Sequence, residues 1–124
     1  MSEGNGHTGL TLDEILAIED RSPVFCEIPE WGPDKDGKPR GVWMLPCSGS
    51  ERDKFEKADA GDQGGREHLL AGCLCDADGN RFNPSPAQLM ELMGKSGKTI
   101  QRMAVMAADI SGYFIRDPED LAKN

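Results

Sequence analysis

The chain changes character at Pro46-Cys47-Ser48-Gly49-Ser50-Glu51-Arg52-Asp53-Lys54-Phe55-Glu56. Both tryptophans and the strand-like runs lie before this stretch, whereas the residues after it are rich in methionine and have the apolar spacing of helices. Ser50, which three charged residues follow, can cap a helix that runs to about Ala60 and is held to the protein through Phe55. The stretch therefore predicts the point where an extended front half gives way to a helical back half.

The N-terminal residues predict a tail and one short helix. Residues 1–9 contain three glycines and no aliphatic residue, which favours disorder. Thr11-Leu12-Asp13-Glu14 matches a capping box, in which a Thr hydroxyl and a Glu carboxylate satisfy backbone donors at a helix start. We expect this helix to end before Pro23 and residues 10–124 to form a single domain.

A β-hairpin is predicted next. Residues 24–31 and 40–45 have strand composition, and Asp36-Gly37 between them is typical of a tight turn. A turn centred on that dipeptide pairs Cys26 with Cys47, Ile28 with Leu45 and Glu30 with Trp43. In this register Trp43 points toward the core and Trp31 points outward.

About four helices are expected to follow the hairpin, the first of them the helix from Ser50 to about Ala60, so the fold class is α+β. After the break at residues 59–65, residues 66–76 carry a buried run at helical or strand spacing. Ser85 and Pro86 begin a helix that ends at Gly94, and a longer helix runs from Ser96 to about Ser111. Residues 117–121 can form a last turn. The apolar residues of the buried run are Leu69, Leu70, Cys73 and Leu74, and those of the long helix are Ile100, Met103, Ala104, Ala107, Ile110 and Phe114.

Composition and charge exclude several classes of partner. The 124 residues include 22 acidic and 14 basic ones, for a formal charge of -8, which repels nucleic acid and anionic membranes. No apolar run approaches the roughly 20 residues that span a bilayer, and the polar N-terminus does not resemble a signal peptide. We therefore expect a soluble protein that stays where it is made, with its four cysteines reduced.

No residues are predicted to be catalytic, to bind a cofactor or to bind a metal. Cys26, Cys47, Cys73 and Cys75 supply enough thiolates for zinc, but they lack the paired spacing of a zinc site, which favours buried thiols. Residues 76–80 start like a calcium loop but lack its glycine at the sixth place and its glutamate at the twelfth. Neither His7 nor His68 has a nucleophile or an acid at a recognisable spacing.

The candidate contacts with a partner protein are apolar. Met90, Met93, Met103 and Met106 form two pairs three residues apart on successive helices. Methionine fills irregular gaps in cores, which is the favoured interpretation, but it also lines grooves that accept varied apolar partners. Trp31, expected to face outward, is the fifth candidate, because tryptophan is enriched in binding hot spots.

The order of these segments resembles the tail assembly chaperone family of long-tailed bacteriophages, over about residues 10–115. The segments that carry the resemblance are a short helix, a strand with Ile28-Pro29-Glu30-Trp31-Gly32, a second strand, the helix start Ser48-Gly49-Ser50-Glu51-Arg52-Asp53-Lys54-Phe55-Glu56, the run 69–74, the turn Asp76-Ala77-Asp78-Gly79-Asn80-Arg81-Phe82, a helix with Leu89 and Leu92, and a last helix ending near Ser111-Gly112. The family usually has a bulky aliphatic residue in place of one of Cys73 and Cys75, and the glycine-rich stretch 61–65 is a further departure.

The resemblance implies a non-enzymatic factor of the host cytoplasm that binds the tape measure protein, and in addition the major tail tube protein, and is absent from the mature virion. A long tape measure helix exposes apolar stripes before the tube closes around it, and an acidic protein with an apolar groove could shield them. Members of the family are often also made as a frameshifted longer form. The codons of Ala122-Lys123-Asn124 can form an A-rich slippery run, a hypothesis that the nucleotide sequence tests.

Two alternatives come from other classes. A structural virion protein, such as a head-tail connector or a tail terminator, would remain in the particle. A small metal-binding adaptor or regulator would use the four cysteines.

Overall fold

The computed structural model describes residues 6–61 and 64–113, which form an α+β fold. In chain order the elements are α1 (Leu12–Ala17), β1 (Val24–Glu27), a 3-10 helix (Pro29–Trp31), β2 (Gly41–Met44), α2 (Gly49–Ala60), α3 (Gly65–Cys73), β3 (Leu74–Cys75), α4 (Pro86–Met93) and α5 (Gly97–Ile110). The expected order of a short helix, a hairpin and four further helices is confirmed. Phe114, the turn at 117–121 and the first five residues of the expected tail lie outside the described residues.

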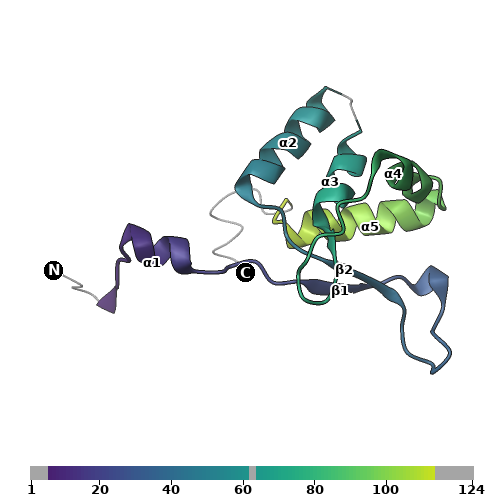
Figure 1. Cartoon of the computed structure of the whole chain (residues 1–124), viewed down its shortest axis with the longest axis horizontal. Helices are drawn as coiled ribbons and strands as arrows, with labels where there is room; N and C mark the ends of the chain where they lie inside the picture. Colours follow the sequence, from purple (N-terminus) through teal and green to yellow (C-terminus); the bar gives the residue numbers. More distant parts are fainter. Residues whose placement is uncertain (1–5, 62–63, 114–124) are drawn as a thin grey trace.

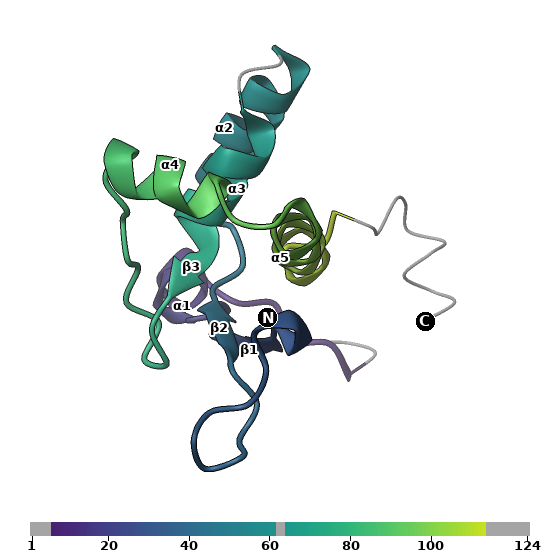
Figure 2. The ribbon, with the colours of Figure 1, turned by 90° about the vertical axis from the view of Figure 1, so that its right-hand side faces the viewer.

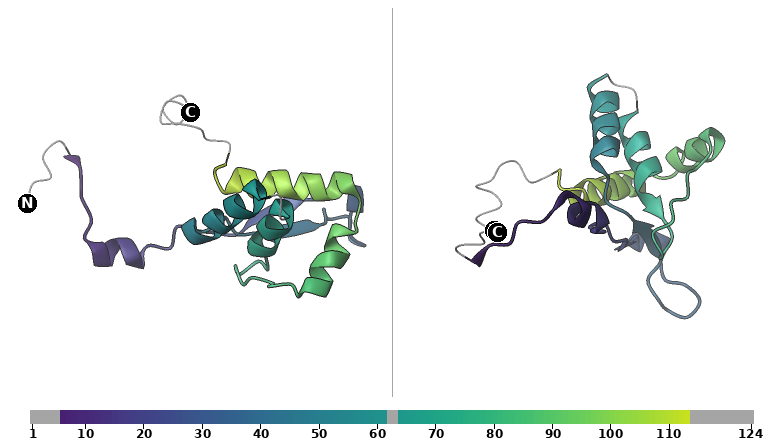
Figure 3. Two further views of the ribbon diagram at one scale, coloured as in Figure 1. Left: turned by 90° about the horizontal axis from the view of Figure 1, so that it is seen from above. Right: turned by 60° about the vertical axis from the view of Figure 1, so that its left-hand side comes forward.

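The helices α2, α3, α4 and α5 gather on one side of a three-stranded antiparallel sheet of order β1-β2-β3 (Figure 1). None of α2, α3, α4 and α5 lies on the opposite side of this sheet (Figure 2). Helix α1 stands away from the rest of the protein at the end of an extended segment (Figure 3). None of the helices within residues 6–61 and 64–113 is long and apolar enough to cross a membrane.

The core lies between the sheet and the helices α3 and α5. Its fully buried members include Ile28 and Met44 from the hairpin, Leu70 and Cys73 from α3, and Met103 from α5. The predicted stripe of α5 is buried at Ile100, Met103, Ala104 and Ala107, and Ile110 is packed against the cluster. The buried run that was compatible with a helix or a strand forms both, because α3 passes directly into β3.

Capping boxes set the starts of three helices. Thr11 caps α1 with Glu14, as predicted, and Ser85 caps α4 with Gln88. The prediction that Ser50 caps α2 is wrong by two residues, because Ser48 caps it instead. Ser48 has extended backbone angles, its hydroxyl accepts from Glu51 N, and the Glu51 carboxylate accepts from Ser48 N at 2.7 Å. That reciprocal pair satisfies two backbone donors at once.

The register predicted for the hairpin is wrong, although the hairpin itself is confirmed. The observed ladder pairs Phe25 with Trp43 and Cys26 with Val42. Near the tip, Pro33 bridges Pro39, whereas Ile28 N donates to Arg40 O at 2.9 Å. Between these two contacts, the segment after β1 advances by five residues, from Ile28 to Pro33, while the segment before β2 advances by only one, from Pro39 to Arg40. The 3-10 helix takes up the extra residues, because Pro29 suits its first position and cannot donate to a ladder.

This change of register exchanges the two tryptophans. Trp31, predicted to face outward, packs against the core, whereas Trp43, predicted to face inward, lies beside Phe25 on the face opposite Cys26 and Val42. Glu30, the neighbour of Trp31, fixes the 3-10 helix to α5, since its carboxylate accepts from Arg102 Nε at 2.7 Å and from Thr99 Oγ1 at 3.1 Å. Both tryptophan orientations therefore follow from one short insertion in the hairpin.

We predict that Ser48→Ala lowers the free energy of unfolding by about 1 kcal/mol, because it removes the hydroxyl that caps α2. The matched control is Ser50→Ala, an exposed position inside the helix, which should change that free energy by less than about 0.5 kcal/mol. Urea denaturation followed by circular dichroism measures both. An equal loss in the two variants would contradict the assignment of Ser48 as the cap.

Candidate functional site

Most of the methionines of the two C-terminal helices fill the core, which is the interpretation favoured from the sequence, and they do not form the alternative groove. Met103 is only 1% exposed and belongs to the core. Met93 and Met106 are half-buried and pack against the same core, whereas Met90 is 76% exposed. Spacings of three and four on α5 place Met103 in line with Ile100 and Ala107, which face the sheet. Three of the four methionines therefore fill the core, and Met90 alone is available to a partner.

The rings of Phe25 and Trp43 form an aromatic pair on the outer face of the sheet. They come from paired positions of β1 and β2, and their centroids are 5.4 Å apart in an edge-to-face arrangement. Phe25 is 41% exposed, and none of α2, α3, α4 and α5 covers this face (Figure 2). The sequence pattern missed this pair, because only the observed register brings the two rings together.

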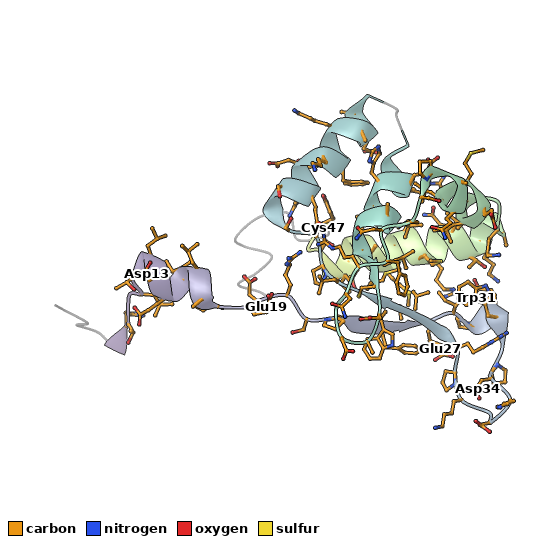
Figure 4. All side chains as sticks on the ribbon, viewed as in Figure 1. Asp13, Glu19, Glu27, Trp31, Asp34 and Cys47 are labelled. Carbon is orange, nitrogen blue, oxygen red and sulfur yellow. The ribbon has the colours of Figure 1, made fainter. Side chains whose placement is uncertain are left out.

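Helix α1 exposes its whole apolar stripe to solvent. Leu12 is 68% exposed and Leu16 is 72% exposed; Ile15 and Ile18 are also exposed, and α1 has no buried residue. Asp13 and Glu14 lie in its first turn, and the pKa of the Glu14 carboxyl is lowered by hydrogen bonds from the Thr11 backbone and hydroxyl. In Figure 4, side chains project from α1 on every side without meeting the rest of the protein.

An isolated helix as short as α1 is marginal in water, since most helical stability in proteins comes from packing of an apolar face. A cluster of exposed aliphatic side chains usually marks a place where another molecule binds. We call the exposed stripe formed by Leu12, Ile15, Leu16 and Ile18 the apolar arm. Phe25 and Trp43 form a second apolar surface, partly exposed, on the sheet. Exposed apolar side chains of this kind suit the binding of an apolar partner.

The four cysteines are free thiols and do not converge on one point. Cys26, Cys73 and Cys75 are buried, and Cys47 is half-buried. Cys47 Sγ and Cys73 Sγ are 3.6 Å apart. Within the part of the chain that the structure describes, no three His, Cys, Asp or Glu side chains are grouped so that they could hold a metal ion.

The turn at residues 76–80 uses its own carboxylate. Asp76 Oδ1 accepts from Asp78 N and from Asn80 N, both at 2.9 Å, and these hydrogen bonds outweigh partial burial and lower the pKa of Asp76. Gly79 supplies the positive φ that the turn requires. The spacing of Asp76, Asp78 and Asn80, which is like the start of a calcium loop, is thus explained by a turn that connects β3 to Arg81.

We predict that Met103→Ala lowers the free energy of unfolding by about 2 to 5 kcal/mol, because it opens a cavity in a packed core. Met90→Ala, the matched exposed position, should change it by less than about 0.5 kcal/mol. Urea unfolding curves of the two variants give the comparison. Similar losses at both positions would mean that Met90 is also packed in solution.

Comparison with known protein families, with curated proteins and with solved structures found no match to this chain. The surfaces described above are therefore the basis for inferring what the protein binds.

Proposed function

We propose that this protein is a non-enzymatic tail assembly chaperone of a long-tailed phage or prophage. It binds apolar segments of the tape measure protein in the host cytoplasm and is released before the virion is complete. The order of elements that resembles the family agrees with the observed order of helices and strands. The single observation that carries the proposal is the exposure of the apolar stripe on α1.

A client helix with apolar stripes would gain stability by packing on this arm. Burial of Leu12 and Leu16 removes apolar surface from water, at roughly 1.5 to 3 kcal/mol for each fully buried side chain. Binding would also give α1 the packing partner that a helix of six residues lacks. Both the client helix and α1 would be stabilised by this contact, so binding alone, without an enzymatic step, would protect the client.

The Phe25–Trp43 pair offers a second contact. An edge-to-face pair presents a rigid apolar surface with little side-chain entropy to lose on binding. Met90 remains a candidate contact on a different element, α4. Trp31, Met93, Met103 and Met106 are assigned to the core and its lining instead.

Charge around the apolar stripe would guide the choice of client. Asp13, Glu14, Glu19 and Asp20 lie on α1 or directly after it, in a chain whose formal charge is -8. Such a field attracts segments whose apolar stripes are flanked by lysine or arginine, and it discourages association between chaperone copies. The major tail tube protein and a frameshifted longer form of the same chain are further proposed partners.

The test is co-expression with the tape measure protein encoded beside this chain. We expect the tape measure protein to become soluble and to co-purify with the wild type. The double variant Leu12→Asp/Leu16→Asp should reduce the co-purified amount about tenfold or more, because it places two carboxylates in the contact. The matched control Val105→Asp changes an exposed aliphatic residue of α5 and should bind normally.

Two outcomes would contradict the proposal. A tape measure protein that stays insoluble in the presence of the wild type would remove the chaperone function. Detection of this chain in purified virions by mass spectrometry would favour the structural virion protein. Equal binding by the wild type and the α1 variant would leave a chaperone that does not use the apolar arm.

A further inference from the structure

Two cysteines from separate segments meet where β2, α2 and α3 converge. Cys47 lies between β2 and α2, Cys73 is the last residue of α3, and their sulfur atoms are 3.6 Å apart. A disulfide bond has a length of about 2.05 Å, so the two sulfurs need to approach by only roughly 1.5 Å. The two thiols are thus positioned to react with each other.

Backbone hydrogen bonds hold both cysteines in place. Leu45 N, two residues before Cys47, donates to Cys73 O at 2.8 Å. Cys47 N donates to Ser111 Oγ at 3.0 Å, at the end of α5. The sulfur contact therefore belongs to a junction of three elements and is not made by two loose loops.

Only one of the two sulfurs faces a recess in the surface. Cys47 lines an open recess of about 220 Å³, while Cys73 is fully buried behind it. Lys54, His68 and Arg81 also line the recess. Figure 4 shows Cys47 at the base of α2. A reagent from solvent would meet Cys47 first.

The surroundings stabilise the Cys47 thiolate. The hydrogen bond from the Cys73 thiol is the largest cause, and despite partial burial it lowers the pKa of Cys47 to about 6, with help from Ser111, Arg81 and Arg52. The same hydrogen bond and burial raise the pKa of Cys73. Burial also raises the pKa of Cys26 and of Cys75. At neutral pH the four thiols therefore have unequal reactivity, and Cys47 is the nucleophile.

The recess carries more positive than negative charge. Glu51, also part of its lining, forms ion pairs with Arg81 and with Arg21, the latter at 3.4 Å. Lys54 has no such partner in the described residues and remains exposed. A small reagent with carboxylate groups would find a favourable field here.

We propose that Cys47 and Cys73 form a dithiol site that is oxidised to an intramolecular disulfide by small disulfides that carry carboxylates. The Cys47 thiolate attacks one sulfur of the reagent, which forms a mixed disulfide and expels the first thiolate. The Cys73 thiol then loses its proton to solvent and attacks Cys47 Sγ, which expels the second thiolate. From the Cys47 thiolate and the Cys73 thiol, the protein loses two electrons and one proton. The reagent gains the two electrons and leaves as two thiolates, which take up that proton and one from water to become thiols. The site does not depend on the proposed function.

The experiment uses the full-length reduced protein with oxidised glutathione at pH 7, followed by intact-mass and fragment mass spectrometry. We expect the wild type to lose the mass of two hydrogens and to hold a Cys47–Cys73 bond. Cys73→Ser should accumulate a glutathione adduct on Cys47, because the second attack is removed. Cys47→Ser should form neither product. Cys26→Ser, which removes a buried thiol elsewhere in the core, should behave like the wild type.

Several results would overturn the proposal. These are a wild type that keeps four free thiols, a disulfide that joins other cysteines, and a Cys47→Ser variant that is still oxidised at the wild-type rate. Circular dichroism checks the folding of each variant.

Because Cys73→Ser alters a buried position, alkylation of the wild type gives a second test: Cys47 should react at pH 7 at least about tenfold faster than Cys26 or Cys75. Equal rates would overturn the assignment of Cys47.

The pH dependence of alkylation follows from the same chemistry. Roughly 90% of a thiol with a pKa of about 6 is ionised at pH 7, against roughly 1 to 3% of an ordinary cysteine. The rate at Cys47 should therefore be half-maximal near pH 6 and fall below it. A midpoint near the ordinary value of cysteine would contradict the role of the Cys73 hydrogen bond.

The preference for carboxylates has its own control. Lys54→Ala should slow the reaction with oxidised glutathione about threefold, because it removes a cation from the recess. The reaction with the uncharged hydroxyethyl disulfide should keep its wild-type rate. An equal effect on both reagents would overturn the assignment of carboxylate-bearing disulfides.

Discussion

The packing of α3 against α2, α4 and α5 on one side of the sheet is the constraint on which the rest of this structure depends. Leu69 and Leu70 fill the core, and α3 contacts α2, α4 and α5. The chain leaves α3 at Cys73 and immediately becomes β3, which completes the sheet beside β2. A helix that continues directly into a strand fixes the helical layer relative to the sheet, because no loop separates the two. Burial of each large aliphatic side chain here contributes roughly 1.5 to 3 kcal/mol.

The same junction organises the polar contacts. Glu51 caps α2 through Ser48 N and forms ion pairs with Arg81, after β3, and with Arg21, before β1. One carboxylate thus links the start of α2, the end of the 76–80 turn and the segment that leads from α1. Arg21 marks where the chain leaves the body, so the apolar arm starts from a fixed point although its own side chains pack on nothing. A fixed base with an exposed apolar stripe would suit the proposed capture of apolar segments.

Local chemistry explains most of what could be predicted. The capping box at Thr11, the Ser85-Pro86 start of α4, the turn at Asp76 and the stripe of α5 each depend on residues within one or two turns of chain. The hairpin was predictable for the same reason, but its register was not. The 3-10 helix at Pro29 inserts residues on one side, and its position is held by a contact between Glu30 and Arg102, distant in the sequence. The sequence favoured core filling for the candidate methionines but left a groove open, because side chains spaced three apart on a helix can face the core as readily as solvent.

The sequence by itself determined the fold class, the starts of α1 and α4, the turn at Asp76 and the excess of negative charge, because these depend on neighbouring residues and on composition. Only the tertiary structure decided which tryptophan is covered, that α1 packs on nothing, and that Cys47 meets Cys73 across twenty-six positions of sequence. Those features depend on which surfaces meet when α3 is buried. Pairing between distant residues is set by the packing of whole elements, and no local pattern records it.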